Sequence, residues 1–338
     1  MSSYADTIPL TEAPILLEVR DVSVEFVSKQ KGAPAARAVD HVSFALREGE
    51  MLGLVGESGC GKTTLMLSLM RLLPAAGRIV TGSIEFMGQD LLDLTESEMS
   101  EVRWRNISII FQGAMNALNP VRTVGDQIAE ALVRHGMAPT GKKSSAAGRV
   151  GDLLEMVGIG ANRANQYPHQ YSGGMRQRAM IAMALACNPQ VVVADEPTTA
   201  LDVMIQAQIL ELLDELRHKL GLSVILVTHD LGVVAEVCDT VLVMYGGVMA
   251  EYADVDTIFN DPQHPYTQQL LNAFPDLTRP TARLISIPGA PPRLDNLPPG
   301  CRFAPRCPQV FDRCHSEPPA LHRLAEGHLA SCHLVESR

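Results

Sequence analysis

Residues 51–73 read MLGLVGESGCGKTTLMLSLMRLL, and this stretch decides the fold. The run MLGLV is continuously apolar, glycines then interrupt it, and the apolar positions of the remainder suit a buried helix. Between strand and helix, Gly56–Thr63 matches the pattern G-x4-G-K-[ST]. The stretch therefore predicts a loop whose backbone N–H groups surround a nucleotide β-phosphate at the positive end of a helix. The alternative is a glycine-rich turn with an exposed lysine, which the flanking strand and helix disfavour.

The residues of this loop have separate expected roles. Lys62 would bind the β- and γ-phosphates of ATP, Thr63 would ligate Mg²⁺, and Thr64 would offer a hydroxyl group to the α-phosphate. We interpret Cys60 as a small filler of the loop rather than as a reactive thiol. The predicted ATP contacts of the loop are Gly56, Ser58, Gly59, Cys60, Gly61, Lys62, Thr63 and Thr64.

Around this loop the chain alternates between strand and helix patterns. A polar tail of residues 1–14 precedes Leu16–Phe26, which alternates in hydrophobicity, and residues 37–50 are expected to supply a further strand pair. Later apolar runs predict strands, and an apolar stripe predicts a helix over residues 203–220. The strand runs are VVVADE (191–196), SVILVT (223–228) and TVLVMY (240–245). The pattern predicts an α/β core with a mainly parallel sheet and an antiparallel β subdomain at its entry.

Residues 113–186 lack a clear strand. Pro120 and several glycines interrupt amphipathic runs near Val124–His135 and Ala146–Val157, so we expect an inserted helical subdomain. Past about Asp254 the pattern changes to Pro-rich sequence, which predicts a second, small module over residues 255–338. The first module would then cover residues 15–254.

The composition excludes several classes of protein. The chain has 338 residues, 46% of them hydrophobic and 20% charged, as expected for a globular fold. A net charge of −10 argues against a protein that wraps nucleic acid. The longest uncharged apolar stretch is broken by Asn188–Gln190, so no segment is expected to span a membrane, and the N-terminus lacks a secretory signal pattern. Seven cysteines, an odd number, make a pure disulfide framework unexpected.

Two carboxylates end the apolar strand VVVADE. Such a position at a strand end is where ligands bind in α/β folds, so we expect Asp195 to hold the Mg²⁺ shell. Glu196 is the candidate base that orients the attacking water. Alone, the pattern also fits a strand that simply meets a turn; combined with the phosphate loop it predicts a nucleotide-hydrolysing site.

Tyr171–Arg178, reading YSGGMRQR, lies before an apolar helix pattern and upstream of the acidic strand. Ser172, Gly173 and Gly174 at a helix start can form an anion site for a γ-phosphate. In this position the sequence resembles the ABC ATPase family, whose signature LSGGQ stands here as YSGGM, with Tyr and Met in place of the first and last residues. The fold implied is a P-loop NTPase (RecA-like) ABC cassette. The resemblance also implies that this phosphate belongs to ATP bound by an opposing cassette.

The resemblance assigns roles to other positions, over roughly residues 16–254. Gln112 resembles the glutamine that touches Mg²⁺ or the attacking water, and His229 in VTHD resembles the switch histidine at the γ-phosphate. Asp202, in ALD (200–202), resembles the loop that contacts the partner cassette. Phe26 stands where the family places an aromatic residue that stacks on adenine, although a core phenylalanine is nearly as plausible. The catalytic set implied is Glu196, His229, Gln112 and Lys62, with Thr63, Gln112 and Asp195 at Mg²⁺.

The C-terminal region narrows the resemblance. DPQHPYTQQLLNAFP (261–275), IPGAPP (287–292) and LPPGCRFAPRCPQVFDRC (297–314) resemble the tail of oligopeptide, dipeptide and nickel importer ATPases. Cysteines with the spacing C-x5-C-x6-C-x17-C favour an Fe–S cluster or Zn²⁺, and metal-free thiols remain possible. The resemblance points to a [4Fe–4S] cluster on Cys301, Cys307, Cys314 and Cys332. We expect a structural staple rather than a redox site.

The resemblance implies several partners. These are a second, related but non-identical ATPase subunit, two transmembrane permease subunits and an extracytoplasmic substrate-binding protein. The chain would then lie on the cytoplasmic face of the cell membrane and power the import of di- and oligopeptides. Nickel, glutathione-like molecules or glycosides are alternative cargoes. The sequence also leaves open a non-transport ABC ATPase and a metal-responsive regulator.

Overall fold

The computed structural model describes residues 13–27, 35–111, 113, 117–138, 143–198, 201–273 and 287–336. The chain divides into two compact units, one formed by Met1–Asp93 with Thr228–Arg338 and the other by Leu94–Val227. The first unit contains the phosphate loop and the C-terminal region; the second contains the acidic strand and the Ser-Gly-Gly segment. The domain boundaries predicted from the sequence stay a prediction.

An antiparallel sheet of the first unit forms the predicted β subdomain. Its strands are β1 (Ile15–Phe26), β2 (Ala36–Arg47), β4 (Gly77–Phe86) and β5 (Gln89–Asp90), in the order β2-β1-β4-β5. The prediction of a strand pair over residues 37–50 was wrong: this segment is the single strand β2, paired along its length with β1. The segment contains no glycine or proline between residues 37 and 47 that could form a hairpin turn.

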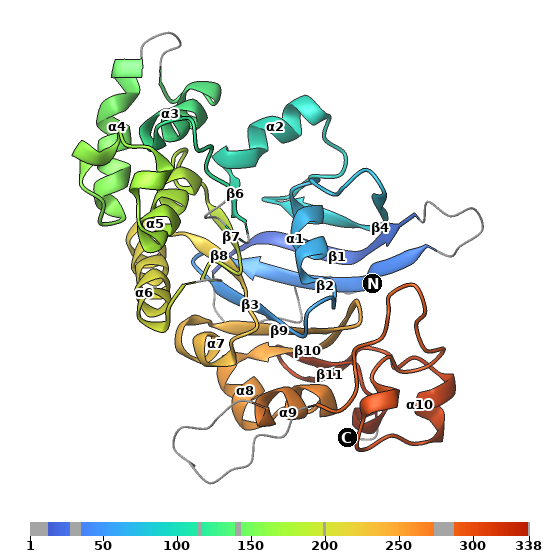
Figure 1. The fold of residues 1–338 in the computed structure, drawn as a ribbon. Helices are drawn as coiled ribbons and strands as arrows, with labels where there is room; N and C mark the ends of the chain where they lie inside the picture. Colours follow the sequence, from blue (N-terminus) through green and yellow to red (C-terminus); the bar gives the residue numbers. More distant parts are fainter. Residues whose placement is uncertain are drawn as a thin grey trace. The chain divides into compact units, whose positions relative to one another are not determined.

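The remaining strands of the first unit run in the order β11-β12-β10-β9-β3. They are β3 (Met51–Val55), β9 (Thr240–Tyr245), β10 (Val248–Asp254), β11 (His322–Ala325) and β12 (His328–Ala330). β3 and β9 are parallel and buried along their whole length, as expected from their uninterrupted apolar sequences. β12 pairs with β10, so the C-terminal hairpin extends the sheet that carries the phosphate loop (Figure 1).

The helices of the first unit are short. They are α1 (Lys62–Leu69), α7 (Leu231–Val237), α8 (Val255–Asn260), α9 (Pro265–Asn272) and α10 (Asp312–Ser316), with 3₁₀ turns η5 (Ala304–Arg306) and η6 (His333–Val335). α9 begins at Pro265, and the His264 side chain accepts a hydrogen bond from the Tyr266 N–H as its cap. Buried Glu251 of β10 accepts the N–H groups of Gln263 and His264, which fixes this start to the sheet.

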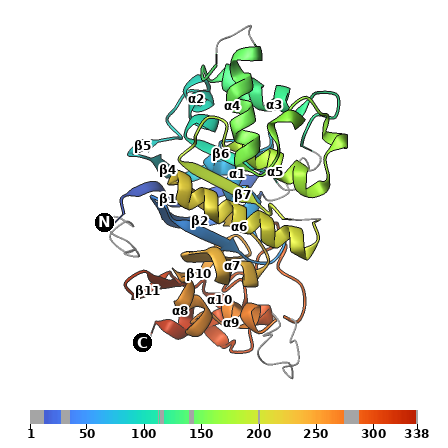
Figure 2. The same ribbon diagram turned by 90° about the vertical axis from the view of Figure 1, so that its left-hand side faces the viewer.

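The second unit contains a parallel sheet in the order β8-β7-β6. Its elements are α2 (Glu96–Arg105), β6 (Ile107–Ile110), α3 (Val124–Arg134), α4 (Lys143–Met156), η3 (Ala161–Arg163), η4 (Pro168–Gln170), α5 (Gly173–Ala184), β7 (Val191–Asp195), α6 (Val203–Leu220) and β8 (Ser223–Val227). α3, α4 and α5 pack on one another (Figures 1 and 2). Between residues 113 and 186 the described residues form helices and turns without a strand, as the sequence predicts.

The helices within the described ranges are all too short or too polar to cross a lipid bilayer.

Candidate nucleotide-binding site

The phosphate loop leads from buried β3 into α1. Lys62, only 7% exposed, lies over its own loop. Its Nζ donates to the carbonyl oxygens of Gly56 at 2.6 Å and Glu57 at 3.1 Å. The ammonium group is therefore held at the mouth of the loop, at the N-terminal end of a helix whose first turn has no acidic residue. This arrangement suits the binding of a phosphate anion.

Two glycines of the loop cannot be replaced without moving the backbone. Gly56 has φ +146°, and an added Cβ would lie 2.2 Å from the Met244 carbonyl oxygen. Gly61 has φ +105°, and its Cβ would lie 2.2 Å from the Ala38 carbonyl oxygen. These glycines let the loop fold tightly against β2 and β9, so the pattern reflects both conformation and close packing.

The other loop residues differ in exposure. Ser58, Gly59 and Thr63 are exposed and Thr64 is half-buried, so their polar groups are open to a ligand. Cys60 is 1% exposed, and burial raises the pKa of its thiol. A buried, protonated thiol is a poor nucleophile, which favours the interpretation of Cys60 as a filler.

Phe26 and His229 belong to the same unit as the loop. Phe26 is half-buried at the end of β1, and its ring lies so close to Gly77 that a Cβ there would be 2.9 Å from the ring. His229 is exposed between Thr228 and Asp230, the N-cap of α7. The Thr228 N–H donates to the Leu54 carbonyl oxygen at 3.2 Å, so the chain before His229 runs beside the strand that enters the loop.

Asp195 and Glu196 end β7 in the second unit. Asp195 is 3% exposed and Glu196 is half-buried. Glu196 has φ +45°, an uncommon conformation for a residue other than glycine. Its N–H donates to the Val227 carbonyl oxygen at 2.9 Å, which holds this backbone against β8. Residues in such sparsely populated conformations cluster at functional sites.

Ser172 is the N-cap of α5. Its exposed hydroxyl group accepts the N–H of Met175 at 3.3 Å. Gly173 and Gly174, both half-buried, begin α5, where the first backbone N–H groups have no carbonyl partner within the helix. Gly174 also has a packing role, because an added Cβ would lie 2.8 Å from Cγ2 of Ile205 on α6.

Substitution can separate the packing role of Gly174 from the phosphate-binding role that the sequence predicts for it. We expect Gly174→Ala to lower the melting temperature, because Ile205 has to move to make room for the new methyl group. A second change, Ile205→Ala, should restore stability by removing the clashing Cγ2. ATP hydrolysis should stay low in the double variant if the open backbone at Gly174 also binds phosphate. Recovery of both properties together would assign Gly174 to packing alone.

Asp202 is the N-cap of α6, and its Oδ1 accepts the Ile205 N–H at 3.0 Å. The next two residues, Val203 and Met204, are 79% and 73% exposed. Gln112 and residues 199–200 lie outside the described residues. The structure thus gathers the phosphate loop, Phe26 and His229 in one unit and the acidic pair, the Ser-Gly-Gly segment and Asp202 in the other.

The four C-terminal cysteines line one small cavity. Burial raises the pKa of the Cys301 and Cys307 thiols, and raises that of Cys332 to about 11. Among the described residues, no group of three or more His, Cys, Asp or Glu side chains is already arranged to hold a metal ion. The donor set and its convergence suit a soft metal, whereas the side-chain positions do not form a coordination shell.

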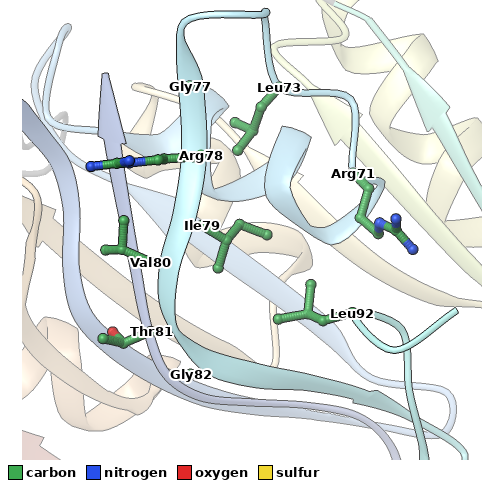
Figure 3. A pocket seen from close by; sticks show the side chains of 9 residues that line it. All are labelled: Arg71, Leu73, Gly77, Arg78, Ile79, Val80, Thr81, Gly82 and Leu92. Atoms are coloured by element: carbon green, nitrogen blue, oxygen red, sulfur yellow. The ribbon is translucent and has the colours of Figure 1, made fainter. Parts of the chain in front are cut away.

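A hollow of about 430 Å³ lies against β4 (Figure 3). Leu73, Ile79 and Leu92 line it together, and none of the predicted nucleotide-binding residues does. The sequence patterns assign no role to Glu57, although this loop residue contacts the C-terminal region through both its backbone and its side chain. Tyr266 and Arg306 are 209 and 249 positions from Glu57, so no local pattern in the sequence could indicate these contacts.

Comparison with known proteins supports the nucleotide-binding cassette and the C-terminal region that the sequence predicts. The ABC transporter family matches residues 39–199, and the oligopeptide/dipeptide transporter C-terminal region matches residues 250–314. The chain is 48% identical to the oligopeptide transport ATP-binding protein AppD of Bacillus subtilis, over 95% of this chain and 97% of that protein. It is also 48% identical to the dipeptide transport ATP-binding protein DppD of Escherichia coli, over 94% and 96% of the two chains.

A solved structure shares the cassette. It is the dimeric post-hydrolysis state of an ATP-binding cassette bound to ADP and Pi, with a TM-score of 0.62 and 27% identity, covering 71% of this chain and 99% of that one. The predicted P-loop NTPase cassette is thereby confirmed. With both regions present along one chain, this protein belongs to the ATP-binding proteins of the ABC transporter family, in the group with the oligopeptide/dipeptide transporter C-terminal region.

Proposed function

We propose that this chain hydrolyses ATP to power the import of di- and oligopeptides by an ABC transporter. One observation carries the proposal: β10, in which the matched oligopeptide/dipeptide transporter region begins, lies in the same sheet as β3, which leads into the phosphate loop, with β9 between them. In this proposal residues 15–254 form the nucleotide-binding domain, residues 113–186 its helical subdomain, and residues 255–338 the extension.

Lys62 and the loop backbone would bind the phosphates of ATP. The hydroxyl group of Thr63 and the carboxylate of Asp195 are the oxygen donors that Mg²⁺ prefers, and Gln112 would add a third. The metal ion would neutralise charge on the transferring phosphoryl group. Glu196 would accept a proton from the attacking water, and His229 would contact the γ-phosphate. Phe26 would stack on the adenine.

A second cassette would complete the site. Ser172 is exposed, and its hydroxyl group together with the N-terminal N–H groups of α5 would suit the γ-phosphate of ATP held by the partner. Val203 and Met204 follow Asp202 as exposed apolar side chains, a feature of surfaces that another protein covers. We therefore propose a second ATPase subunit, related but non-identical, opposite this surface.

The membrane partners in this proposal are two permease subunits and an extracytoplasmic substrate-binding protein. Phe111 is 41% exposed and Val121 is 79% exposed in the second unit, which suits docking to a permease. The chain would lie on the cytoplasmic face of the membrane, where it meets ATP. Its acidic balance does not suit binding to nucleic acid.

Reconstitution tests this function. The chain should be assembled with the permease and partner ATPase subunits into vesicles, and uptake of a labelled dipeptide or tetrapeptide measured with ATP at the face of this subunit. We expect ATP-dependent peptide uptake that needs the binding protein. Uptake of Ni²⁺, glutathione or a glycoside without peptide uptake would contradict peptide import and assign that substrate to the transporter instead.

We further propose that Cys301, Cys307, Cys314 and Cys332 hold a [4Fe–4S] cluster, with Zn²⁺ as the alternative. Support comes from the cavity that all four thiols line and from the soft donor set. Since burial favours the protonated thiols, metal binding must release protons from them. The cluster would join the segments 301–314 and 332, which have little core of their own.

The cluster is testable by its colour and composition. Protein purified without oxygen should show a broad visible absorption band and stoichiometric iron and sulfide. Cys314→Ser should lose both, because one thiolate ligand is removed. Cys187→Ser, a buried cysteine outside the module, is the matched control and should keep them. A colourless protein containing zinc would contradict the iron–sulfur assignment in favour of Zn²⁺.

A further inference from the structure

Glu57, the second residue of the phosphate loop, is held from two directions by the C-terminal region. Its carboxylate accepts two hydrogen bonds from Arg306, Nη1 to Oε2 at 2.5 Å and Nη2 to Oε1 at 2.9 Å. Its backbone N–H donates to the Tyr266 hydroxyl oxygen at 2.9 Å. Both contacts lie within the first unit. A bidentate pair fixes the orientation of the two side chains as well as their distance, so the start of the loop is attached to the extension.

Arg306 is itself fixed before it meets the loop. The side chain is 4% exposed. Its Nε donates to the Pro288 carbonyl oxygen at 2.8 Å, its Nη1 donates to the Tyr245 hydroxyl group at 3.2 Å, and its guanidinium carbon lies 5.8 Å from the centre of the Tyr245 ring. These contacts fix the orientation of the guanidinium group, with its Nη atoms directed at the Glu57 carboxylate.

Tyr266 is fixed by packing. It is fully buried, with ring centres 4.5 Å from Tyr245 and 5.4 Å from Phe303. Tyr245 and Phe303 are also in contact, at 5.1 Å. The hydroxyl group that accepts the Glu57 N–H therefore stands on a rigid aromatic cluster contributed by β9, α9 and the segment between the first two cysteines of the module.

The position of the Glu57 backbone in turn affects the position of Lys62. The Glu57 carbonyl oxygen accepts a hydrogen bond from Lys62 Nζ at 3.1 Å, next to the bond from Lys62 to Gly56. A shift of the Glu57 backbone would thus move the ammonium group that is to meet the phosphates. The pair also has an electrostatic effect, because without Arg306 the loop would carry an unneutralised carboxylate, whose negative charge disfavours the binding of phosphates to the same loop.

We propose that Arg306 and Tyr266 are positioning residues for the phosphate loop, so that the C-terminal extension sets the affinity of this chain for ATP through Glu57 and Lys62. The inference rests on the proposed function, in which this loop binds ATP. Arg306 acts in two ways: it fixes the backbone beside Lys62, and it neutralises the one carboxylate that the loop sequence GESGCGKT contains.

The test compares variants of the full chain by direct titration with ATP. Arg306→Met should raise the Kd for ATP at least about 10-fold, because the Glu57 carboxylate then repels the phosphates. Adding Glu57→Gln to Arg306→Met should recover part of the affinity, since the repelling charge is gone. A purely structural role would give a double variant that binds no better than the single one. Raising the salt concentration should narrow the gap between Arg306→Met and the unaltered chain.

Arg313→Met is the matched control. Arg313 belongs to the same C-terminal module and pairs with Glu317 and Glu336, but it is 43% exposed, and neither partner lies in the loop. Its loss should leave the Kd within about twofold, as expected for an exposed ion pair. Should Arg306→Met fail to fold, Tyr266→Phe tests the positioning role instead and should also raise the Kd for ATP. It keeps the ring and removes only the hydroxyl acceptor of the Glu57 N–H.

The outcomes separate this inference from the proposed function. Binding of ATP by the unaltered chain and its loss in Lys62→Ala support the loop assignment whatever Arg306 does. A Kd unchanged in Arg306→Met or in Tyr266→Phe overturns the positioning role, and a double variant no tighter than Arg306→Met overturns the neutralising role. An unaltered chain that does not bind ATP overturns the proposed function and this inference with it.

Discussion

Glu196→Gln is expected to slow ATP hydrolysis about 10²- to 10⁴-fold while ATP binding is retained. The substitution keeps the size of the side chain and removes its capacity to accept a proton. Glu196 directly follows buried Asp195 at the end of β7, where its backbone has φ +45° and its N–H is fixed to Val227. Since the amide keeps these backbone contacts, the fold should be unchanged, and the loss should fall on the chemical step.

Single-turnover measurements separate the two effects. Mixing the variant with ATP and following product over one turnover gives the chemical rate, and a titration gives the Kd. Glu211→Gln is the matched control, because Glu211 is an exposed carboxylate on α6 of the same unit. We expect it to hydrolyse ATP at the unaltered rate. Normal turnover in Glu196→Gln would exclude Glu196 as the base and require another proton acceptor.

Much of the fold could be predicted from the sequence because its elements have local signals. The uninterrupted apolar runs of β3, β7 and β9 are buried along their whole length, as fully buried strands require. The apolar stripe over residues 203–220 coincides with α6. β2 shows the limit: the sequence predicts a strand pair here, whereas the segment from 37 to 47, which contains no glycine or proline, forms one long strand.

The candidate site could be predicted only where its residues stand close together in the sequence. The phosphate loop and the Ser-Gly-Gly segment are of this kind, since the conformation of a few consecutive residues creates each anion site. The link from Arg306 through Glu57 to Lys62 is of the other kind. It depends on the tertiary packing of the extension. Nothing in the sequence around Arg306 indicates that its partner is Glu57. Gly174 similarly shows a packing contact with Ile205 that the motif conceals.

Lys62→Ala is expected to weaken ATP binding at least about 10-fold, because a hydrogen bond to a charged group contributes about 1.5–3 kcal/mol. The change removes the ammonium group that lies at the mouth of the loop. It also leaves the Gly56 and Glu57 carbonyl oxygens without the donor at 2.6 Å and 3.1 Å, so the loop loses an internal support as well as a charge. Both losses act on the same step, the binding of the phosphates.

Lys62→Arg distinguishes the charge from the geometry. Arginine keeps the positive charge, but its planar guanidinium is larger than the ammonium group and cannot occupy the same buried position over the loop, where Lys62 is 7% exposed. We therefore expect Lys62→Arg to bind ATP more weakly than the unaltered chain. Lys219→Ala, an exposed lysine near the end of α6, is the matched control and should bind normally. Unchanged affinity in Lys62→Ala by direct titration would contradict the phosphate-loop assignment, because no other cation of the loop sequence could replace the lost ammonium group.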